Sequence, residues 1–119
     1  MSRNNHGHID NEHDLFAELC PCRSLLDLLG NKWSTLTIGA LDEGPQRFGE
    51  LQHTLAGISP KVLTQTLRRL EDHGLVVREI CAEVPLRVEY SLTLLGADAC
   101  APLAHLRTWV EQNISRFPA

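Results

Sequence analysis

One short segment, GISPKVLTQTLRRLEDHGLV at residues 57–76, carries cationic and hydrogen-bonding side chains at helical spacing. Placed at about 100° per residue from Pro60, the side chains divide into a polar face and a mainly aliphatic face. The polar face holds Lys61, Thr64, Gln65, Arg68 and Asp72, and the other holds Val62, Leu63, Thr66, Leu67 and Leu70. Arginine and glutamine can form paired hydrogen bonds with base edges, threonine can contact a thymine methyl group, and a helix N-terminus favours phosphate. The segment therefore predicts a helix that enters the DNA major groove, although any surface helix also needs a polar face.

Thiol groups offer a second chemistry, at Cys20, Cys22, Cys81 and Cys100. Cys20 stands at the start of a predicted helix, where the positive end of the helix dipole and nearby Arg23 would favour its thiolate. Cys22 completes a Cys-x-Cys pair, which together with the histidines His6, His8 and His13 raises the hypothesis of a soft-metal site. Cysteine is also a common small core residue, which is the simplest interpretation of Cys81 and Cys100.

Catalytic constellations are missing from the sequence. There is no pair of acidic residues at a spacing typical of acid–base catalysis, no nucleophile with its general base, and no phosphate-binding loop. The histidines His53, His73 and His105 are scattered along the chain. We therefore predict a protein that is not an enzyme and that has no cofactor.

Length and composition predict one globular domain. The chain has 119 residues, of which 43% are hydrophobic and 22% charged, and its net charge is −4. Residues 1–46 hold three basic and seven acidic residues, whereas residues 47–93 hold six of each, so the excess acid lies before the basic helix. The sequence has no apolar run of the roughly 20 residues that span a bilayer, nor the apolar core of a signal peptide, which predicts a cytoplasmic protein with reduced thiols and no membrane partner.

The pattern of apolar residues, caps and turns predicts the elements that position these side chains. Residues 1–13 are too polar to pack and predict a disordered tail, and residues 14–119 predict the domain. Helices are expected over residues 21–29, 33–41, 46–57 and 60–73, and strands over 75–80 and 87–92 with a hairpin loop at 81–86. A final helix follows Thr93, its N-cap, and carries Pro102 as a candidate kink. The fold class is mostly α with a small β-hairpin.

The third and fourth helices, joined by a turn that contains Gly57, form a helix-turn-helix, and the hairpin that follows has the position of a wing. The loop of such a hairpin lies beside the groove and contacts phosphate or the minor groove, which assigns this role to Arg87. Because helix and hairpin agree, we interpret the chain as a winged helix-turn-helix DNA-binding domain. A winged helix that binds protein is the alternative, but the basic residues of the polar face favour DNA.

Three stretches, CPCRSLLDLLGNKW, GPQRFGELQHTLAGISPKVLTQTLRRLEDHGLVVRE and EVPLRVEYSLTLLG, resemble the HxlR family of MarR-like bacterial transcription regulators over roughly residues 20–110. The resemblance implies a homodimer whose terminal helices form the interface, and a near-palindromic operator in double-stranded DNA with half-sites about 10 bp or a multiple apart. It also implies DNA contacts by Ser59, Lys61, Thr64, Gln65 and Arg68, phosphate contact by Arg47 and wing contact by Arg87. Arg47 could equally serve only to solubilise its loop.

The family resemblance also implies a sensing role. Several HxlR-type proteins respond to oxidants or electrophiles through the cysteine of the Cys-Pro motif, here Cys20, while others respond to small molecules unrelated to thiols. Cys81 or Cys100 could form a disulfide with Cys20 across a dimer. The metal hypothesis rests on Cys20 and Cys22, which look like the ELCxC motif of ArsR-type repressors, but in those proteins the motif lies on the helix-turn-helix itself.

Overall fold

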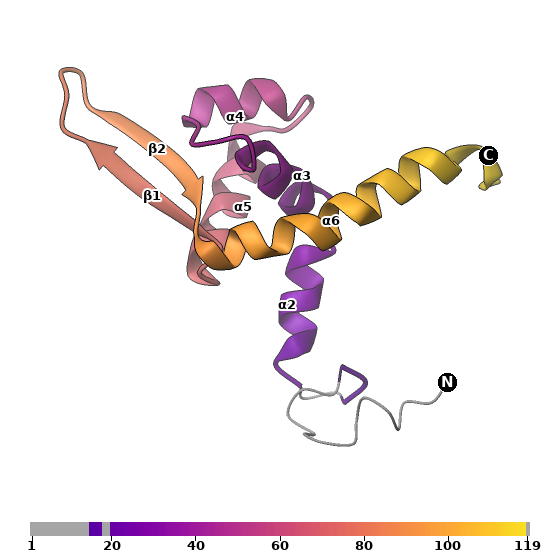
Figure 1. Cartoon of the computed structure of the whole chain (residues 1–119). Coiled ribbons are helices and arrows are strands. Elements are labelled where there is room, and N and C mark those ends of the chain that lie inside the picture. Colours follow the sequence, from indigo (N-terminus) through magenta and orange to yellow (C-terminus); the bar gives the residue numbers. More distant parts are fainter. Residues whose placement is uncertain (1–14, 18–19, 119) are drawn as a thin grey trace.

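The computed structural model of the chain describes residues 15–17 and 20–118, so the predicted disordered tail lies outside the described residues. In chain order the elements are α2 (Cys22–Leu29), α3 (Lys32–Leu41), α4 (Phe48–Thr54), α5 (Pro60–Asp72), β1 (Val76–Cys81), β2 (Arg87–Leu92), α6 (Leu94–Asn113) and the short 3₁₀ helix η2 (Ile114–Arg116). Figure 1 shows a helical body from which the hairpin extends on one side and the end of α6 on the other. The predicted class, mostly α with a winged helix-turn-helix, is confirmed.

Helix α5 owes its position to three leucines. Leu63 and Leu70 are completely buried and Leu67 is 2% exposed, in a core that α3 and α4 also line. Burial of each such side chain is worth about 1.5–3 kcal/mol, so the rotation of the helix about its axis is strongly determined. The aliphatic face predicted for this segment is therefore the core face.

Both ends of α5 are closed by specific hydrogen bonds. The Ser59 hydroxyl accepts a bond from the backbone N–H of Val62 at 3.1 Å, and Pro60 occupies the first helical position. At the other end Gly74 adopts a φ of +76°, which allows the N–H of Leu75 to bond to the carbonyl of Leu70 at 2.9 Å. These bonds fix the predicted boundaries of the helix.

Strands β1 and β2 pair antiparallel from Val76 opposite Leu92 to Cys81 opposite Arg87. A bridge that the sequence did not predict joins the hairpin to the body, because Gln46 and Tyr90 exchange backbone bonds of 2.8 and 2.9 Å. Gln46 was expected to belong to the third helix, over residues 46–57. That expectation was too long, since only Phe48–Thr54 is helical.

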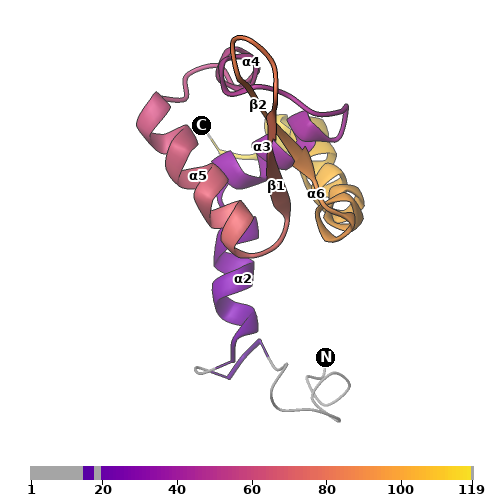
Figure 2. The ribbon, with the colours of Figure 1, turned by 90° about the vertical axis from the view of Figure 1, so that its left-hand side faces the viewer.

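Helix α3 lies at the centre of the molecule and packs against α2, α4, α5, α6 and β2. It begins at Lys32 because the Asn31 side chain caps it, accepting from the backbone N–H groups of Trp33 and Ser34 at 2.9 and 3.3 Å. The sequence placed this start at Trp33 without identifying the cap. Viewed from the wing side, α5 and α6 lie on opposite sides of the hairpin (Figure 2).

Thr93 joins the end of α5 to the start of α6. Its hydroxyl donates to the carbonyl of Gly74 at 2.6 Å and accepts from the N–H of Gly96 at 3.1 Å, while its own N–H donates to the carbonyl of Leu75 at 3.1 Å. A side chain at Gly96 would collide with the Leu75 carbonyl, so glycine is required for this close approach. The two helices therefore meet at a rigid corner.

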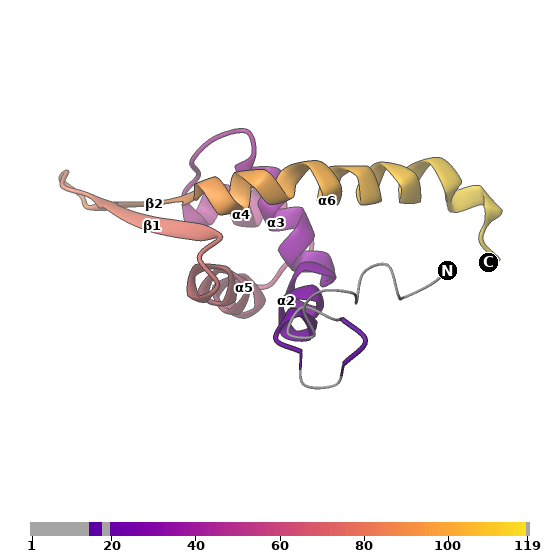
Figure 3. The same cartoon turned by 60° about the horizontal axis from the view of Figure 1, so that its bottom comes forward.

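Helix α6 continues through Pro102, and its C-terminal half projects beyond the body (Figure 3). Arg107 anchors its middle, donating to the carbonyl of Thr35 at 3.0 Å and to the hydroxyl of the same residue at 3.2 Å. Among the described residues, no helix combines the length and apolar character needed to cross a membrane.

The core role of α5 predicts the effect of trimming it. Leu67→Ala should lower the free energy of unfolding by about 2–5 kcal/mol, because it removes a buried side chain and leaves a cavity. Gln65→Ala, on the exposed face of the same helix, is the matched control and should change stability by less than about 0.5 kcal/mol. Urea denaturation followed by circular dichroism measures both, and equal losses would mean that the helix is rotated differently.

Candidate nucleic-acid interface

The outer face of α5 carries the side chains that the sequence singled out. Lys61, Gln65 and Arg68 are exposed, and Thr64 is half-buried beside them. This face is opposite the leucines that pack against the core, as the helical spacing predicts. The arrangement offers two cations and two hydrogen-bonding side chains within one helical face, which suits the edges of bases and their phosphates.

Ser59 already has a structural task. Its hydroxyl caps α5 by accepting from Val62, and the residue is exposed at the positive end of the helix. A helix N-terminus attracts phosphate through its backbone N–H groups and dipole. Ser59 thus holds the end of α5 in a form that can meet an anion, and direct contact of its side chain with DNA stays a prediction.

Arg68 and Arg69 are neighbours in sequence with different surroundings. Arg68 is exposed on the polar face. The guanidinium of Arg69 lies 3.7 Å from the Asp27 carboxylate of α2, with 46% of the arginine side chain exposed. This contact between α2 and the flank of α5 was not predicted, because it joins helices that are distant in sequence.

Arg47 lies at the start of α4 and is exposed. Its backbone N–H donates to the carboxylate of Glu50 at 2.8 Å, which caps the helix. The turn from α4 to α5 passes through Gly57, whose φ of +91° is in the left-handed region. The side chain of Arg47 is thus placed at the beginning of the helix-turn-helix, where phosphate contact remains a prediction.

In the wing, Arg87 is held by acids of the hairpin itself. Its guanidinium lies 2.8 Å from the carboxylate of Glu83 and 3.5 Å from that of Glu89. A hydrogen bond with the Cys81 side chain, followed by the charge of Glu83, raises the pKa of Arg87 above its usual value. The sequence assigned Arg87 to DNA contact without these partners, so its charge is less available than expected.

A further cation of the wing escaped the sequence interpretation. Arg78, opposite Tyr90 in the hairpin, has 56% of its side chain exposed and lies 3.6 Å from the Glu71 carboxylate. The alternation of the strand could have identified it as a surface residue. Its proximity to α5 could not be read from the chain.

The thiols of Cys20 and Cys22 are neighbours at the start of α2. Cys20 is 6% exposed, and its sulfur accepts a hydrogen bond from the backbone N–H of Cys22 at 3.3 Å. A side-chain hydrogen bond with Cys20, and then burial, raise the pKa of Cys22. The Cys20 sulfur thus lies within hydrogen-bond distance of a backbone N–H at the start of α2, and its role as a sensor stays a prediction.

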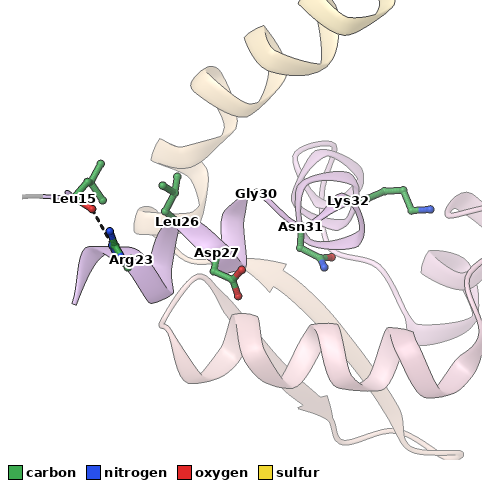
Figure 4. Close-up of a pocket in the computed structure, with 7 residues that line it drawn as sticks. All are labelled: Leu15, Arg23, Leu26, Asp27, Gly30, Asn31 and Lys32. Carbon is green, nitrogen blue, oxygen red and sulfur yellow. Dashed lines mark hydrogen bonds between the residues drawn. The ribbon is translucent and has the colours of Figure 1, made fainter. Parts of the chain in front are cut away.

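Arg23 has backbone partners that the sequence did not indicate. Its guanidinium donates to the carbonyl of Leu15 at 3.1 Å (Figure 4). It also donates to the carbonyl of Phe16 at 3.4 Å, and the two bonds tie the preceding segment to α2. These bonds orient it toward backbone oxygens. Arg23 therefore ties residues 15 and 16 to α2, and its expected support of the Cys20 thiolate stays a prediction.

The other two cysteines are engaged elsewhere. Cys100 is buried in α6, where its thiol donates to the carbonyl of Gly96 at 3.6 Å, and burial followed by a bond with Asp42 raises its pKa. Cys81 is half-buried at the end of β1 beside Arg87. Within the described residues no group of three or more His, Cys, Asp or Glu side chains could hold a metal ion, and His6, His8 and His13 lie outside them.

Large apolar side chains remain uncovered on α2 and α6. On α6, Leu95, Leu106, Trp109 and Val110 are 39–57% exposed and fall within about 100° of one another around the helix. On α2, Leu25 and Leu26 are 39% and 57% exposed. Apolar surface of this kind commonly marks a contact with another protein.

Comparisons with known proteins agree with this geometry. A family model described as HxlR-like helix-turn-helix matches residues 28–117. The HTH-type transcriptional regulator YtfH of Escherichia coli strain K12 is 42% identical over 103 residues, which cover 87% of this chain and 82% of that protein.

Solved structures give the same picture. The transcriptional regulator ytfH from Salmonella typhimurium superposes with a TM-score of 0.79 at 40% identity, covering 86% of this chain and 91% of that one. The reduced form of the transcriptional regulator YodB from B. subtilis has a TM-score of 0.71 at 35% identity, covering 84% and 99%, and YodB has also been solved after diamide treatment.

Proposed function

The chain belongs to the HxlR-like helix-turn-helix family of transcriptional regulators, and from that premise we propose that it is a homodimer that reads a near-palindromic DNA operator through α5. Regulators of this family are not enzymes, in agreement with the sequence. The observation that carries the proposal is the outward position of Lys61, Gln65 and Arg68 above a buried row of leucines.

In the proposed complex the N-terminal part of α5 enters the major groove. Arg68 and Gln65 have the geometry for paired bonds to guanine and adenine, and Thr64 can contact a thymine methyl group. Lys61 and the helix N-terminus behind Ser59 would face phosphate. Arg47, at the start of α4, would contact the backbone as the first helix of the pair crosses it.

The wing has a smaller share in this proposal. Residues 76–92 contain two arginines and three glutamates, so the hairpin is not a cationic element overall. Arg87 would have to exchange its Glu83 partner for a phosphate, whereas the more exposed Arg78 lies nearer to α5. We therefore assign most of the binding free energy to α5.

Two adjacent arginines provide a sharp test. Arg68→Ala should weaken specific binding by about 1–3 kcal/mol if this residue reads a base. Arg69→Ala should have a smaller effect, because Arg69 is turned toward Asp27. Fluorescence anisotropy on DNA from upstream of the protein's own gene, over a salt series, measures both affinities. An unchanged affinity for Arg68→Ala would remove this residue from the interface.

The dimer is proposed from the exposed apolar surface of α6 and α2. The C-terminal half of α6 extends past the core, so the body of the same chain cannot cover it (Figure 3). Trp109 stacks obliquely on Phe117 with ring centroids 5.8 Å apart, which enlarges the apolar area. A second copy packed on this surface would place two α5 helices on one face of DNA, as a near-palindrome requires.

Substitution on α6 tests the dimer. Leu106→Glu should convert the dimer to a monomer, because a charge would be buried in the interface. Thr108→Glu is the matched control, since Thr108 is exposed on the other side of the helix and should tolerate the charge. Sedimentation or light scattering at micromolar concentration gives the mass. A wild-type chain that is monomeric throughout would contradict the proposal.

We also propose that oxidation or alkylation of Cys20 lowers operator affinity. Support comes from the hydrogen bond that the Cys20 sulfur accepts at the start of α2, and from the reduced and diamide-treated structures of the related regulator YodB. Helix α2 reaches α5 through Asp27 and Arg69, and its Leu28 is completely buried in the core. A change at the start of α2 thus has a route to the DNA-facing helix.

Replacing the thiol separates binding from sensing. Cys20→Ser should bind the operator normally in reductant and should no longer release it when hydrogen peroxide or diamide is added. Cys81→Ser is the control and should still respond. Anisotropy before oxidant, after oxidant and after dithiothreitol follows the cycle. A serine variant that still responds would exclude Cys20 as the sensor.

A further inference from the structure

Cys20 and Cys22 are joined by contacts that bring their sulfur atoms together. The Cys20 sulfur accepts the N–H of Cys22 at 3.3 Å, and the Cys22 thiol makes a side-chain hydrogen bond with Cys20. Both residues are placed by the start of α2, with Cys22 its first residue. A hydrogen-bonded thiol beside a second sulfur is well placed to attack it once that sulfur has become electrophilic.

The backbone between them places their Cα atoms at a separation that is found in disulfides. Pro21 is helical, with φ −58° and ψ −22°. In helical geometry residues two apart have Cα atoms about 5.4 Å from each other. Disulfides span Cα separations of about 4.4–6.8 Å, so the separation of the two Cα atoms is compatible with a disulfide.

We propose that Cys20 and Cys22 close to an intrachain disulfide under oxidation, with Cys22 as the resolving thiol for Cys20. The inference rests on the proposed role of Cys20 and adds the partner that completes its chemistry. Neither the family match, which begins at residue 28, nor any relative's name assigns a role to Cys22.

With a peroxide as oxidant the steps balance. The Cys20 thiolate attacks one oxygen of hydrogen peroxide, the O–O bond breaks, and hydroxide leaves and takes up the proton that the Cys20 thiol has lost. The Cys22 sulfur then attacks the sulfur of the Cys20 sulfenic acid, its S–OH bond breaks, and the Cys22 proton leaves with hydroxide as water. Two thiols and one peroxide give one disulfide and two waters.

The other cysteines are poorer partners for Cys20. Cys100 is buried in α6, and its thiol is bonded to the carbonyl of Gly96. Cys81 is on the hairpin, which extends from the side of the body away from the start of α2 (Figure 1). A disulfide between Cys20 and Cys22 does not require one helix or strand to move toward another, because both residues lie at the start of α2.

Mass spectrometry of the whole protein tests the proposal. The reduced chain is treated with one equivalent of hydrogen peroxide, blocked with N-ethylmaleimide and digested with trypsin, which cleaves after Arg3 and Arg23 and leaves both cysteines in one peptide. The expected product is this peptide without maleimide and lighter by two hydrogens. Chains joined to each other on a non-reducing gel, with Cys22 carrying maleimide, would overturn the proposal.

Two variants complete the test. Cys22→Ser should lose the closed peptide and accumulate Cys20 sulfenic acid, trapped by dimedone, or interchain cross-links. Cys81→Ser should give the closed peptide in wild-type yield, and its loss in that variant would overturn the assignment.

Operator binding, measured in the same samples, separates this proposal from the one on which it rests. A closed peptide with unchanged DNA affinity would support the disulfide and contradict the regulatory role of Cys20. Oxidant release of DNA by Cys22→Ser, with wild-type rate and full recovery in dithiothreitol but with neither sulfenic acid nor interchain cross-links, would overturn the resolving role while leaving Cys20 as the sensor.

Discussion

Burial of one row of leucines on α5 determines what the helix presents to a partner. The side chains of a helix keep fixed angular positions around its axis. Burial of Leu63, Leu67 and Leu70 in the core therefore determines which side chains lie on the exposed face. The apolar contacts are worth several kcal/mol in total, whereas exposed lysine and arginine gain little from any particular orientation. The buried leucines therefore determine which side chains of α5 form the binding surface, although they do not contact the partner. This explains how an acidic chain with a net charge of −4 can carry a basic face.

Local signals made the elements predictable. Ser59 with Pro60, Gly74 and Thr93 act within a few residues of their own positions, through hydrogen bonds to neighbouring backbone or through glycine's freedom at positive φ. The helical period placed the polar face of α5 correctly for the same reason. These features follow from chemistry along the chain, and the structure has them where the sequence indicates.

Contacts between distant segments were not predictable. The bridge of Gln46 to Tyr90 shortened the expected third helix, and the acids around Arg87 altered the charge of the wing. Arg23 donates to the carbonyls of Leu15 and Phe16, which its place in the sequence did not indicate. In each case a side chain or backbone group found a partner that spacing alone does not identify. The DNA-binding assignments of individual residues still rest on position and chemistry.

The hydroxyl of Thr93 donates to the carbonyl of Gly74 and accepts from the N–H of Gly96. These two hydrogen bonds hold the end of α5 next to the start of α6. In the proposed dimer, the packing angle of the two α6 helices would therefore determine the distance between the two α5 helices, because Thr93 connects each α6 to its α5. Base preference and half-site separation would then have different origins in the chain. Changes on the outer face of α5 would alter which bases are recognised. Changes along α6 would alter the distance between the two α5 helices, and with it the separation of the half-sites.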